Sequence, residues 1–433
     1  MYCDKESIKQ FPPITSTNHT HLIGIHWEIS SACQAACPCC IRKGNDNALA
    51  PFMQTFTTVE TVEKVLEGID DLQHISFCGN IGDPMTNPDI TKICEFLKNK
   101  YNRISIKIHT NGGIGKLERY YELGKLGVRM IFGVDGTAGI NELHRAQVDF
   151  SRVDKNAREF IRGLKEHRKI YPLNQDALFQ VQFIVWDQNV FNIPDLIKWV
   201  EDIDGDEIFV RRTYGSVVTP VFGNEGEFLT ALSYVNPDRY APILEQVYHK
   251  TQFKRLLNDW NKIPEVAERV MPLPRSAITE NSVVRNPQKI KFPQHGPYIP
   301  ESSTLKKLEK NKKTDVRCNA VYYDLGGVLR TYIFITYQNI VMPCCFISSF
   351  YSSAIMGQVR SFEDYPHTVD ATEAETMNKL IEMGIDRFDG AKRGLKAILN
   401  DGTLDEFALL KVHTDDKLGL CAKYCAKRGG CHS

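Results

Sequence analysis

The sequence predicts an α/β fold built on a parallel sheet. Short β-type runs alternate with helical patterns from about residue 22 to residue 215. Six β/α units in a row imply parallel strands joined by right-handed crossovers. The length of 433 residues suits one large domain and one smaller domain. The pattern fits a doubly wound sheet or an open barrel, and in both the reactive residues lie at the carboxyl ends of the strands.

The predicted elements of this region follow in chain order. The strands are Leu22–Ser30, His74–Cys78, Arg103–Thr110, Arg129–Asp135, Leu178–Trp186 and Asp206–Arg212. The helices are Thr57–Gly68, Asn87–Lys98, Gly115–Leu126, Val153–His167 and Ile193–Ile203. Apolar residues recur at helical spacing over Val62–Leu72, which indicates a buried helix face.

The pattern is looser after Tyr214. Helices are predicted at Pro237–Thr251 and Phe253–Trp260. Residues 271–316 hold several prolines and a lysine-rich stretch, which predicts a linker or a surface loop whose lysines form a solvated face. A hairpin is expected at Leu329–Met342, followed by helices.

Composition and charge exclude several classes of protein. The 53 basic and 53 acidic residues balance, so no overall field favours nucleic acid or an anionic membrane as a partner. No apolar run approaches the roughly 20 residues that span a bilayer. The first residues show no basic-then-apolar signal pattern, and we therefore expect a cytoplasmic protein.

The thirteen cysteines are clustered. An odd count in a long chain without a signal pattern argues against a disulfide framework, and clustered thiols in a reducing compartment more often bind metal. One group lies near the start and one near the end: Cys33, Cys37, Cys39 and Cys40, then Cys318, Cys344, Cys345, Cys421, Cys425 and Cys431. Cys78 and Cys94 are expected to be core residues.

A C-x3-C-x2-C motif follows the first predicted strand directly and consists of Cys33, Cys37 and Cys40. Three thiolates on one loop can hold three irons of a [4Fe–4S] cluster and leave the fourth iron open. A structural zinc site is the alternative, but it needs a fourth protein ligand and usually a second knuckle. Cys39 is expected to be a packing residue.

Further segments make the sequence similar to the radical S-adenosylmethionine (SAM) enzymes. Gly79–Asp89, after the second strand, resembles the Gly-Gly-Glu-Pro segment that takes the SAM amino group, with Asp83 where Glu is commoner. His109–Gly113 resembles the Thr-Asn-Gly turn. Phe132–Thr137 resembles Ser-Ile-Asp-Gly, with Gly133 in place of Ser. His144–Val153 resembles an arginine-containing loop, with Arg145 displaced.

The resemblance covers residues 22–215 and implies a partial (β/α)6 TIM-like barrel. It also implies that SAM chelates the open iron of the cluster and that one electron cleaves SAM to methionine and a 5′-deoxyadenosyl radical, which takes hydrogen from a substrate. Its implied cofactor-binding residues are Gly82, Asp83, Pro84, Asn111 and Asp135. Arg211 ends the sixth strand and is expected to meet an anionic substrate or the SAM carboxylate, or else to form a surface salt bridge.

The second cysteine region, with Asn339–Tyr365 at its centre, resembles the SPASM and twitch extensions of the same family. Those extensions hold auxiliary [4Fe–4S] clusters, and six cysteines suit one cluster. The expected ligands are Cys318, Cys344, Cys421 and Cys425, and Cys431 can replace one of these. A second auxiliary cluster would need a ligand other than cysteine. A zinc site remains the alternative.

The expected organisation is an N-terminal extension (1–21), the partial barrel (22–215), a connecting segment (216–316) and an α+β auxiliary-cluster domain (317–433). The expected function is an oxidoreductase-like redox or rearrangement step on a peptide or a small metabolite such as a sugar. A flavodoxin or ferredoxin-type protein would donate electrons.

Two other functions stay open. One is an activating enzyme that acts on a folded partner protein. The other is a non-catalytic iron–sulfur scaffold, against which the SAM-type segment at Gly82–Pro84 argues.

Overall fold

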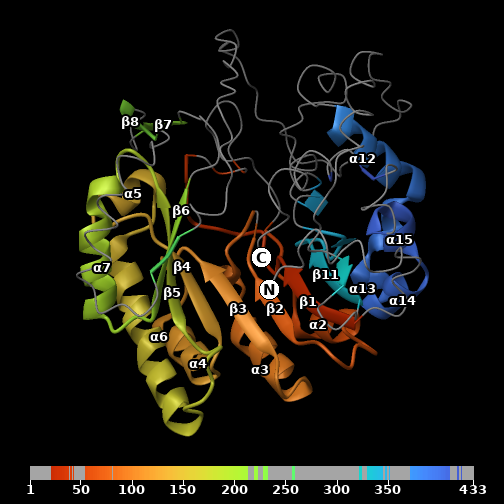
Figure 1. Ribbon diagram of the computed structural model, residues 1–433, viewed down its shortest axis with the longest axis horizontal. Coiled ribbons are helices and arrows are strands. Elements are labelled where there is room, and N and C mark those ends of the chain that lie inside the picture. Colours follow the sequence, from red (N-terminus) through yellow and green to blue (C-terminus); the bar gives the residue numbers. More distant parts are fainter. Residues whose placement is uncertain are drawn as a thin grey trace. The chain divides into compact units, whose positions relative to one another are not determined.

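The computed structural model describes most of the predicted α/β region and parts of the remainder (Figure 1). The described residues are 21–38, 40, 42, 54–79, 81–212, 219–222, 228–232, 256–258, 321–323, 329–344, 347–348, 351, 371–409, 417–418 and 421. They divide into two compact units. The first unit takes residues 1–32, 52–106 and 288–433, and the second takes residues 33–51 and 107–287.

The first unit is built on strands from both ends of the sequence. β1 (His21–Trp27) lies parallel between β2 (His74–Phe77) and β11 (Leu329–Ile335). β10 (Val321–Tyr323) and β12 (Val341–Met342) both pair antiparallel with β11. The β11–β12 pair confirms the predicted hairpin.

Two helices of the first unit, α2 (Val59–Val65) and the short η1 (Pro84–Thr86), begin at capping residues. Thr58 caps α2, and η1 starts with proline after Asp83. α3 (Ile90–Lys100) buries one apolar face. The C-terminal helical elements are α12 (Ala371–Met383), η4 (Ile385–Phe388), α13 (Gly390–Arg393), α14 (Leu395–Asn400) and α15 (Thr403–Phe407).

The second unit carries the next strands in chain order. β3 (Ser105–Thr110), whose residues from 107 belong here, pairs parallel with β4 (Arg129–Gly133), and β4 with β5 (Phe179–Val185). β6 (Glu207–Arg212) lies parallel between β5 and β9 (Leu256–Asn258). β7 (Thr219–Phe222) and β8 (Phe228–Leu232) form a separate hairpin.

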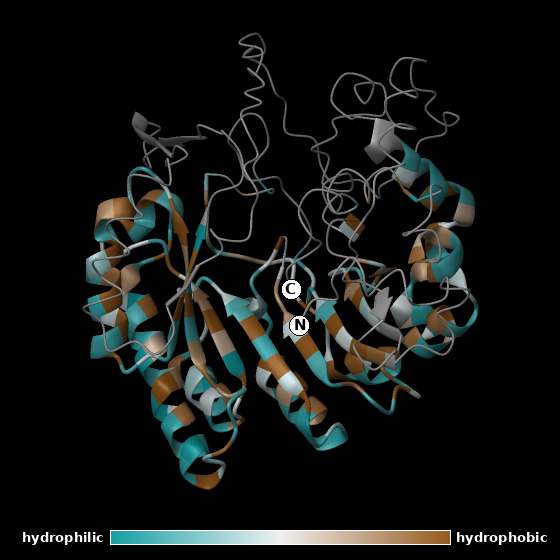
Figure 2. Cartoon of the chain, in the orientation of Figure 1, coloured by the Kyte–Doolittle hydropathy of each residue, from teal (hydrophilic) through white to brown (hydrophobic). Residues whose placement is uncertain are grey.

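The helices of the second unit connect these strands. They are α4 (Leu117–Lys125), α5 (Asn141–His144), α6 (Phe150–Ile170), η2 (Val190–Asn192) and α7 (Ile193–Asp202). Strand residues alternate between hydrophobic and hydrophilic, as Figure 2 shows and as the alternating burial of β3 confirms. One side of β3 therefore packs in the core, whereas the central residues of β4 are buried on both sides.

The predicted α/β fold class is confirmed. All six predicted strands and all five helices between them are present, with boundaries within three residues of the prediction. The order and parallel register in each unit are those of the predicted partial (β/α)6 barrel. No helix among the described residues is long and apolar enough to cross a membrane.

Two expectations were wrong. Residues 256–258 of the predicted helix Phe253–Trp260 form strand β9. This strand hydrogen-bonds to the edge of β6, whose backbone groups would otherwise lack partners in the sheet. Cys78 is only partly buried, whereas Cys94 is fully buried as expected. The predicted helix Pro237–Thr251 and the segment 271–316 lie outside the described residues.

Candidate cofactor site

Three thiols lie on the loop that follows β1. Cys33, Cys37 and Cys40 are each partly buried and none is in a disulfide. The Cys40 amide donates to the Cys37 carbonyl over 3.0 Å, which closes a tight turn between the last two thiols. The Ala36 amide donates to the Ala146 carbonyl over 2.8 Å and ties the loop to the segment after α5. The loop is thus held by backbone contacts on both sides of Cys37.

Arg42 holds the same loop from within. Its Nη1 donates to the Cys33 carbonyl over 3.0 Å, its Nη2 donates to the Ala35 carbonyl, and its Nε lies 3.4 Å from the Cys40 sulfur. Burial favours the neutral guanidinium, but the neighbouring Cys40 and Cys33 thiols raise the pKa of Arg42. Arg42 thus places a buried positive charge beside two thiols of the loop.

Asn111 connects the end of β3 to the first thiol. Its Nδ2 donates to the Cys33 sulfur over 3.5 Å, and its Oδ1 accepts from Gln34 Nε2 over 2.7 Å. Oδ1 also accepts from the Gly113 amide over 2.9 Å. The structure therefore places Asn111, predicted as a cofactor-binding residue, in contact with a predicted cluster ligand. The contributions of Gln34 and Arg42 were not predicted from the sequence.

A second guanidinium, that of Arg145, acts on the thiol of Cys37. Burial raises the pKa of Cys37, and Arg145 opposes this increase. Burial lowers the pKa of Arg145, but Asp135 and the Cys37 and Cys33 thiols raise it overall. The donor set is thus three thiols with two cations close by, which fits an iron–sulfur cluster bound by thiolates.

Within the described parts of the chain, no three His, Cys, Asp or Glu side chains gather closely enough to hold a single ion.

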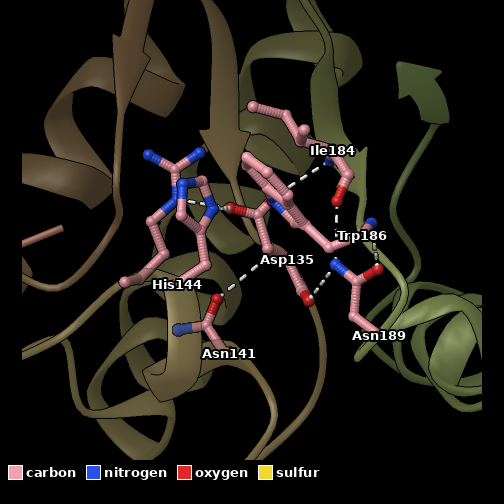
Figure 3. A network of polar contacts seen from close by, with 7 residues as sticks. Asp135, Asn141, His144, Ile184, Trp186 and Asn189 are labelled. Carbon is pink, nitrogen blue, oxygen red and sulfur yellow. Dashed lines mark hydrogen bonds and ion pairs between the residues drawn. The ribbon is translucent and has the colours of Figure 1, made fainter. Parts of the chain in front are cut away.

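Asp135, after β4, is the centre of a buried polar network (Figure 3). Its Oδ1 accepts from the Ile184 amide over 2.8 Å, and its Oδ2 accepts from Arg145 Nε over 2.7 Å and from His144 Nδ1. Its backbone amide donates to Asn141 Oδ1, and its carbonyl accepts from Asn189 Nδ2. The carboxylate is 0% exposed, so both of its oxygens are used by the protein itself.

The network keeps Asp135 ionised. Burial alone would raise the pKa of this carboxyl, but Arg145 and His144 together lower it to about 2. Trp186 packs edge-on against the His144 ring at 5.1 Å between centroids, which orients the imidazole (Figure 3). Asp135, predicted as a cofactor-binding residue, is therefore placed to position Arg145.

Arg145 retains binding capacity after this contact. Its Nε is used by Asp135, and in the described part of the chain Nη1 and Nη2 have no hydrogen-bond partner. A Cβ atom added at Gly133 would lie 2.9 Å from Nη2, so glycine leaves room for the guanidinium where the family has serine. The sequence pattern suggested a displaced arginine, and only the packing shows that Arg145 lies beside the thiol loop.

In the first unit, the segment Gly82–Pro84 is anchored to the residues that precede the thiol loop. The Asp83 amide donates to the Ala32 carbonyl over 2.7 Å. A Cβ atom at Gly82 would lie 2.0 Å from the Ser30 carbonyl oxygen, so only glycine permits this approach. Asp83 is buried, and its Oδ1 accepts from the Met85 amide over 3.0 Å.

The comparison with protein families matches residues 27–169 to the Radical SAM superfamily. This range holds the thiol loop, the Gly82–Pro84 segment and Asn111, together with Asp135, His144 and Arg145 of the polar network. Residues 27–169 form a radical SAM domain. The superfamily implies a [4Fe–4S] cluster and SAM as cofactors, and SAM cleavage as the chemistry.

Solved structures of similar proteins include SuiB from Streptococcus suis and anSMEcpe. The SuiB structure is 12% identical at a TM-score of 0.44, and the alignment covers 76% of this chain and 61% of SuiB. A SuiB structure bound to SAM is 13% identical at a TM-score of 0.45, and the alignment covers 79% of this chain and 68% of SuiB. The structure of anSMEcpe with SAM and the Cp18Cys peptide is 13% identical at 0.44, covering 95% and 92%. The chain thus spans about three-fifths of the first SuiB structure, and no curated protein matches it.

The other predicted residues lie outside this cluster of contacts. The Arg211 guanidinium lies 5.0 Å from the Phe209 ring centroid, and its Nε is a buried donor without a partner in the described part of the chain. Cys344 is partly buried and Cys421 is buried. Cys318, Cys425 and Cys431 lie outside the described residues.

Proposed function

We propose that this protein is a radical SAM enzyme that binds a [4Fe–4S] cluster through Cys33, Cys37 and Cys40. It cleaves SAM reductively and abstracts hydrogen from a peptide or a small metabolite such as a sugar. The observation that carries the proposal is the loop itself. Its three thiols are supported by Arg42 from within, by Asn111 at Cys33 and by Arg145 at Cys37.

Once bound, the cluster supplies the electron for SAM cleavage. The residues of this chain hold and orient the cofactor. Arg145 presents Nη1 and Nη2 to the SAM carboxylate, because a guanidinium edge matches a carboxylate with two parallel hydrogen bonds. Asp135 fixes Arg145 through Nε, so the orientation is set before SAM binds.

The segment Gly82–Pro84 is proposed to take the SAM amino group. The Asp83 carboxylate and the carbonyls of this segment are acceptors for the N–H groups of this amine. Arg211 is proposed to bind an anionic group, because its buried Nε–H is a hydrogen-bond donor without a partner among the described residues.

We further propose one auxiliary cluster on Cys318, Cys344, Cys421 and Cys425, or with Cys431 in place of one of them. A flavodoxin or ferredoxin-type protein would supply electrons to the enzyme. SuiB has been solved bound to the precursor peptide SuiA, and anSMEcpe bound to the Cp18Cys peptide. For this chain, a peptide and a small metabolite remain two outcomes of a substrate screen.

The decisive experiment is anaerobic reconstitution with iron and sulfide, followed by SAM and dithionite. We expect about eight irons per chain, the content of two [4Fe–4S] clusters, and formation of 5′-deoxyadenosine. The variant C33A/C37A/C40A should lose about four irons and all deoxyadenosine. C94A is the matched control, because Cys94 is buried on α3, and it should behave as the parent. Deoxyadenosine formation by the triple variant would refute the assignment.

A further inference from the structure

Two hydroxyl groups of the first unit link the residues after β1 to the segment Gly82–Pro84. Thr86 Oγ1 lies 2.6 Å from the Asp83 carbonyl oxygen and 3.1 Å from the Ala32 carbonyl oxygen. It also lies 2.6 Å from Ser30 Oγ, which accepts from the Ala32 amide over 3.0 Å. Ser30 is buried, and all of these residues belong to the first unit.

The direction of these hydrogen bonds follows from the number of hydrogens. The Thr86 hydroxyl has a single hydrogen, and a carbonyl oxygen can only accept, so this hydrogen goes to a carbonyl. The Ser30 hydroxyl then donates to Thr86 Oγ1. The Asp83 carbonyl gives the shorter contact with Thr86 Oγ1, and it also accepts from the Thr86 amide over 3.0 Å. Both lone pairs of the Asp83 carbonyl oxygen are thus used by the protein itself.

The peptide plane before Asp83 is fixed by a separate contact. The Asp83 amide donates to the Ala32 carbonyl over 2.7 Å. In a trans peptide the carbonyl and the following N–H point in opposite directions, so the Gly82 carbonyl points away from Ala32. None of the described residues donates a hydrogen bond to the Gly82 oxygen. The Gly82 carbonyl is therefore available as an acceptor, whereas the Asp83 carbonyl is not.

We propose that Thr86, held by Ser30, is a positioning residue for the SAM amino group. Thr86 fixes the peptide plane after Asp83 and contacts the carbonyl that fixes the plane before it. The Gly82 carbonyl and the Asp83 carboxylate are thus the acceptors for the amine, and their orientation is set before SAM binds, which lowers the entropic cost of binding. The inference rests on the proposed function, in which this segment takes the SAM amino group.

Thr91, on α3, provides a matched control. Its Oγ1 is buried and has no hydrogen-bond partner in the described part of the chain. T91V and T86V both replace a hydroxyl by a methyl group of similar size. Only T86V removes a hydrogen bond, so a difference between the two variants reports the contacts of Thr86.

The first measurement is calorimetry of SAM binding to the reconstituted holoenzyme. T86V should bind SAM about tenfold more weakly, the effect of losing one hydrogen bond and leaving a carbonyl unsatisfied. T86S retains the hydroxyl and should bind SAM almost as tightly as the parent. T91V should match the parent.

An analogue of SAM without the amino group separates positioning from a general loss of structure. This analogue cannot use the acceptors of the segment, so T86V and the parent should bind it with equal affinity. If T86V weakens the binding of SAM and of the analogue to the same extent, Thr86 has only a structural role and the proposal is refuted.

A spectroscopic measurement gives a second test. SAM that carries 15N in the amino group is added to the reduced holoenzyme, which is frozen at once and examined by electron–nuclear double resonance. The parent and T86S should show the same 15N coupling to the cluster, and the coupling in T86V should be broadened or lost. If the parent shows no coupling, the proposed function fails. If the parent shows it and T86V matches the parent in coupling and affinity, the role of Thr86 is refuted and the proposed function stands.

Discussion

Two arginines next to the thiol loop provide positive charge that would stabilise a negatively charged cluster. Three thiolates and a cluster concentrate negative charge, and burial raises the pKa of Cys37. Arg42 and Arg145 offset this through nearby positive charge. The Asp135 carboxylate in turn orients the Arg145 guanidinium, and this guanidinium lowers the pKa of the Cys37 thiol.

Asn111 provides a test at this scale. Its Nδ2 donates to the Cys33 sulfur, and such a donor stabilises the more negative, reduced cluster. N111A should form the cluster with a midpoint potential lower by some tens of millivolts, measured by redox titration with electron paramagnetic resonance. N111D retains the acceptor for Gly113 and adds negative charge, so its potential should be lower still. An unchanged potential in both variants would contradict the contact.

Asp83 provides a second test. D83N retains an acceptor for the Met85 amide and removes the charge, whereas D83A also removes the cap. Both should bind the cluster normally and bind SAM about tenfold more weakly, the effect of one charged hydrogen bond. D83A should in addition lose about 1 kcal/mol of stability. Calorimetry of SAM binding measures the first effect, and undiminished affinity in D83N would exclude the ionic role.

Among the elements, the packing of α4 against α6 depends on two glycines. A Cβ atom at Gly163 would lie 2.0 Å from the Tyr121 carbonyl oxygen, and one at Gly124 would lie 2.3 Å from the Phe160 carbonyl oxygen. These neighbours are backbone atoms, which cannot move aside as a flexible side chain can. The two helices therefore approach closely only because neither position has a side chain.

G163A tests this packing. Alanine favours a helix by about 1 kcal/mol over glycine. The clash with α4 should outweigh that gain and lower the free energy of unfolding by about 2 kcal/mol. Urea denaturation of the variant measures the change. K155A, at an exposed site on the same helix, is the control and should remain within about 0.5 kcal/mol of the parent. Unchanged or greater stability of G163A would show that the helices can separate at no cost.

At the scale of the whole chain, strand β11 joins the second cysteine region to β1 within the first unit. It lies parallel to β1, with Ile335 opposite Trp27, although about 300 residues separate them in the sequence. Cys344 follows soon after the β11–β12 hairpin. The region that resembles an auxiliary-cluster extension therefore starts from the sheet that also carries β1.

The auxiliary cluster itself is tested by counting iron. C318A/C344A should lower the iron content from about eight to about four per chain, because one of two [4Fe–4S] clusters is lost. SAM cleavage should continue, because Cys33, Cys37 and Cys40 are unchanged. Iron content equal to that of the parent would place the auxiliary site on other residues, and bound zinc would replace it with a structural metal site.

The sequence by itself determined the α/β class, the six strands and five helices of residues 22–215, and the thiol loop. These features are local: alternation of polar and apolar residues marks a strand, helical spacing marks a helix, and three cysteines within eight residues mark a ligand loop. Gly82 could also be singled out from the sequence, because it belongs to the short segment Gly79–Asp89 that the sequence pattern identifies.

Only the tertiary structure decided which distant residues support those features. Arg145 beside the thiols, Asn111 on Cys33, Thr86 on Ser30 and β9 in place of a helix all arise from contacts across many residues. Local patterns carry no information about such partners, because parallel strands bring together chain segments that are far apart in sequence. The thiol loop could thus be recognised in the sequence, while the charged and polar groups that contact it could be identified only from the fold.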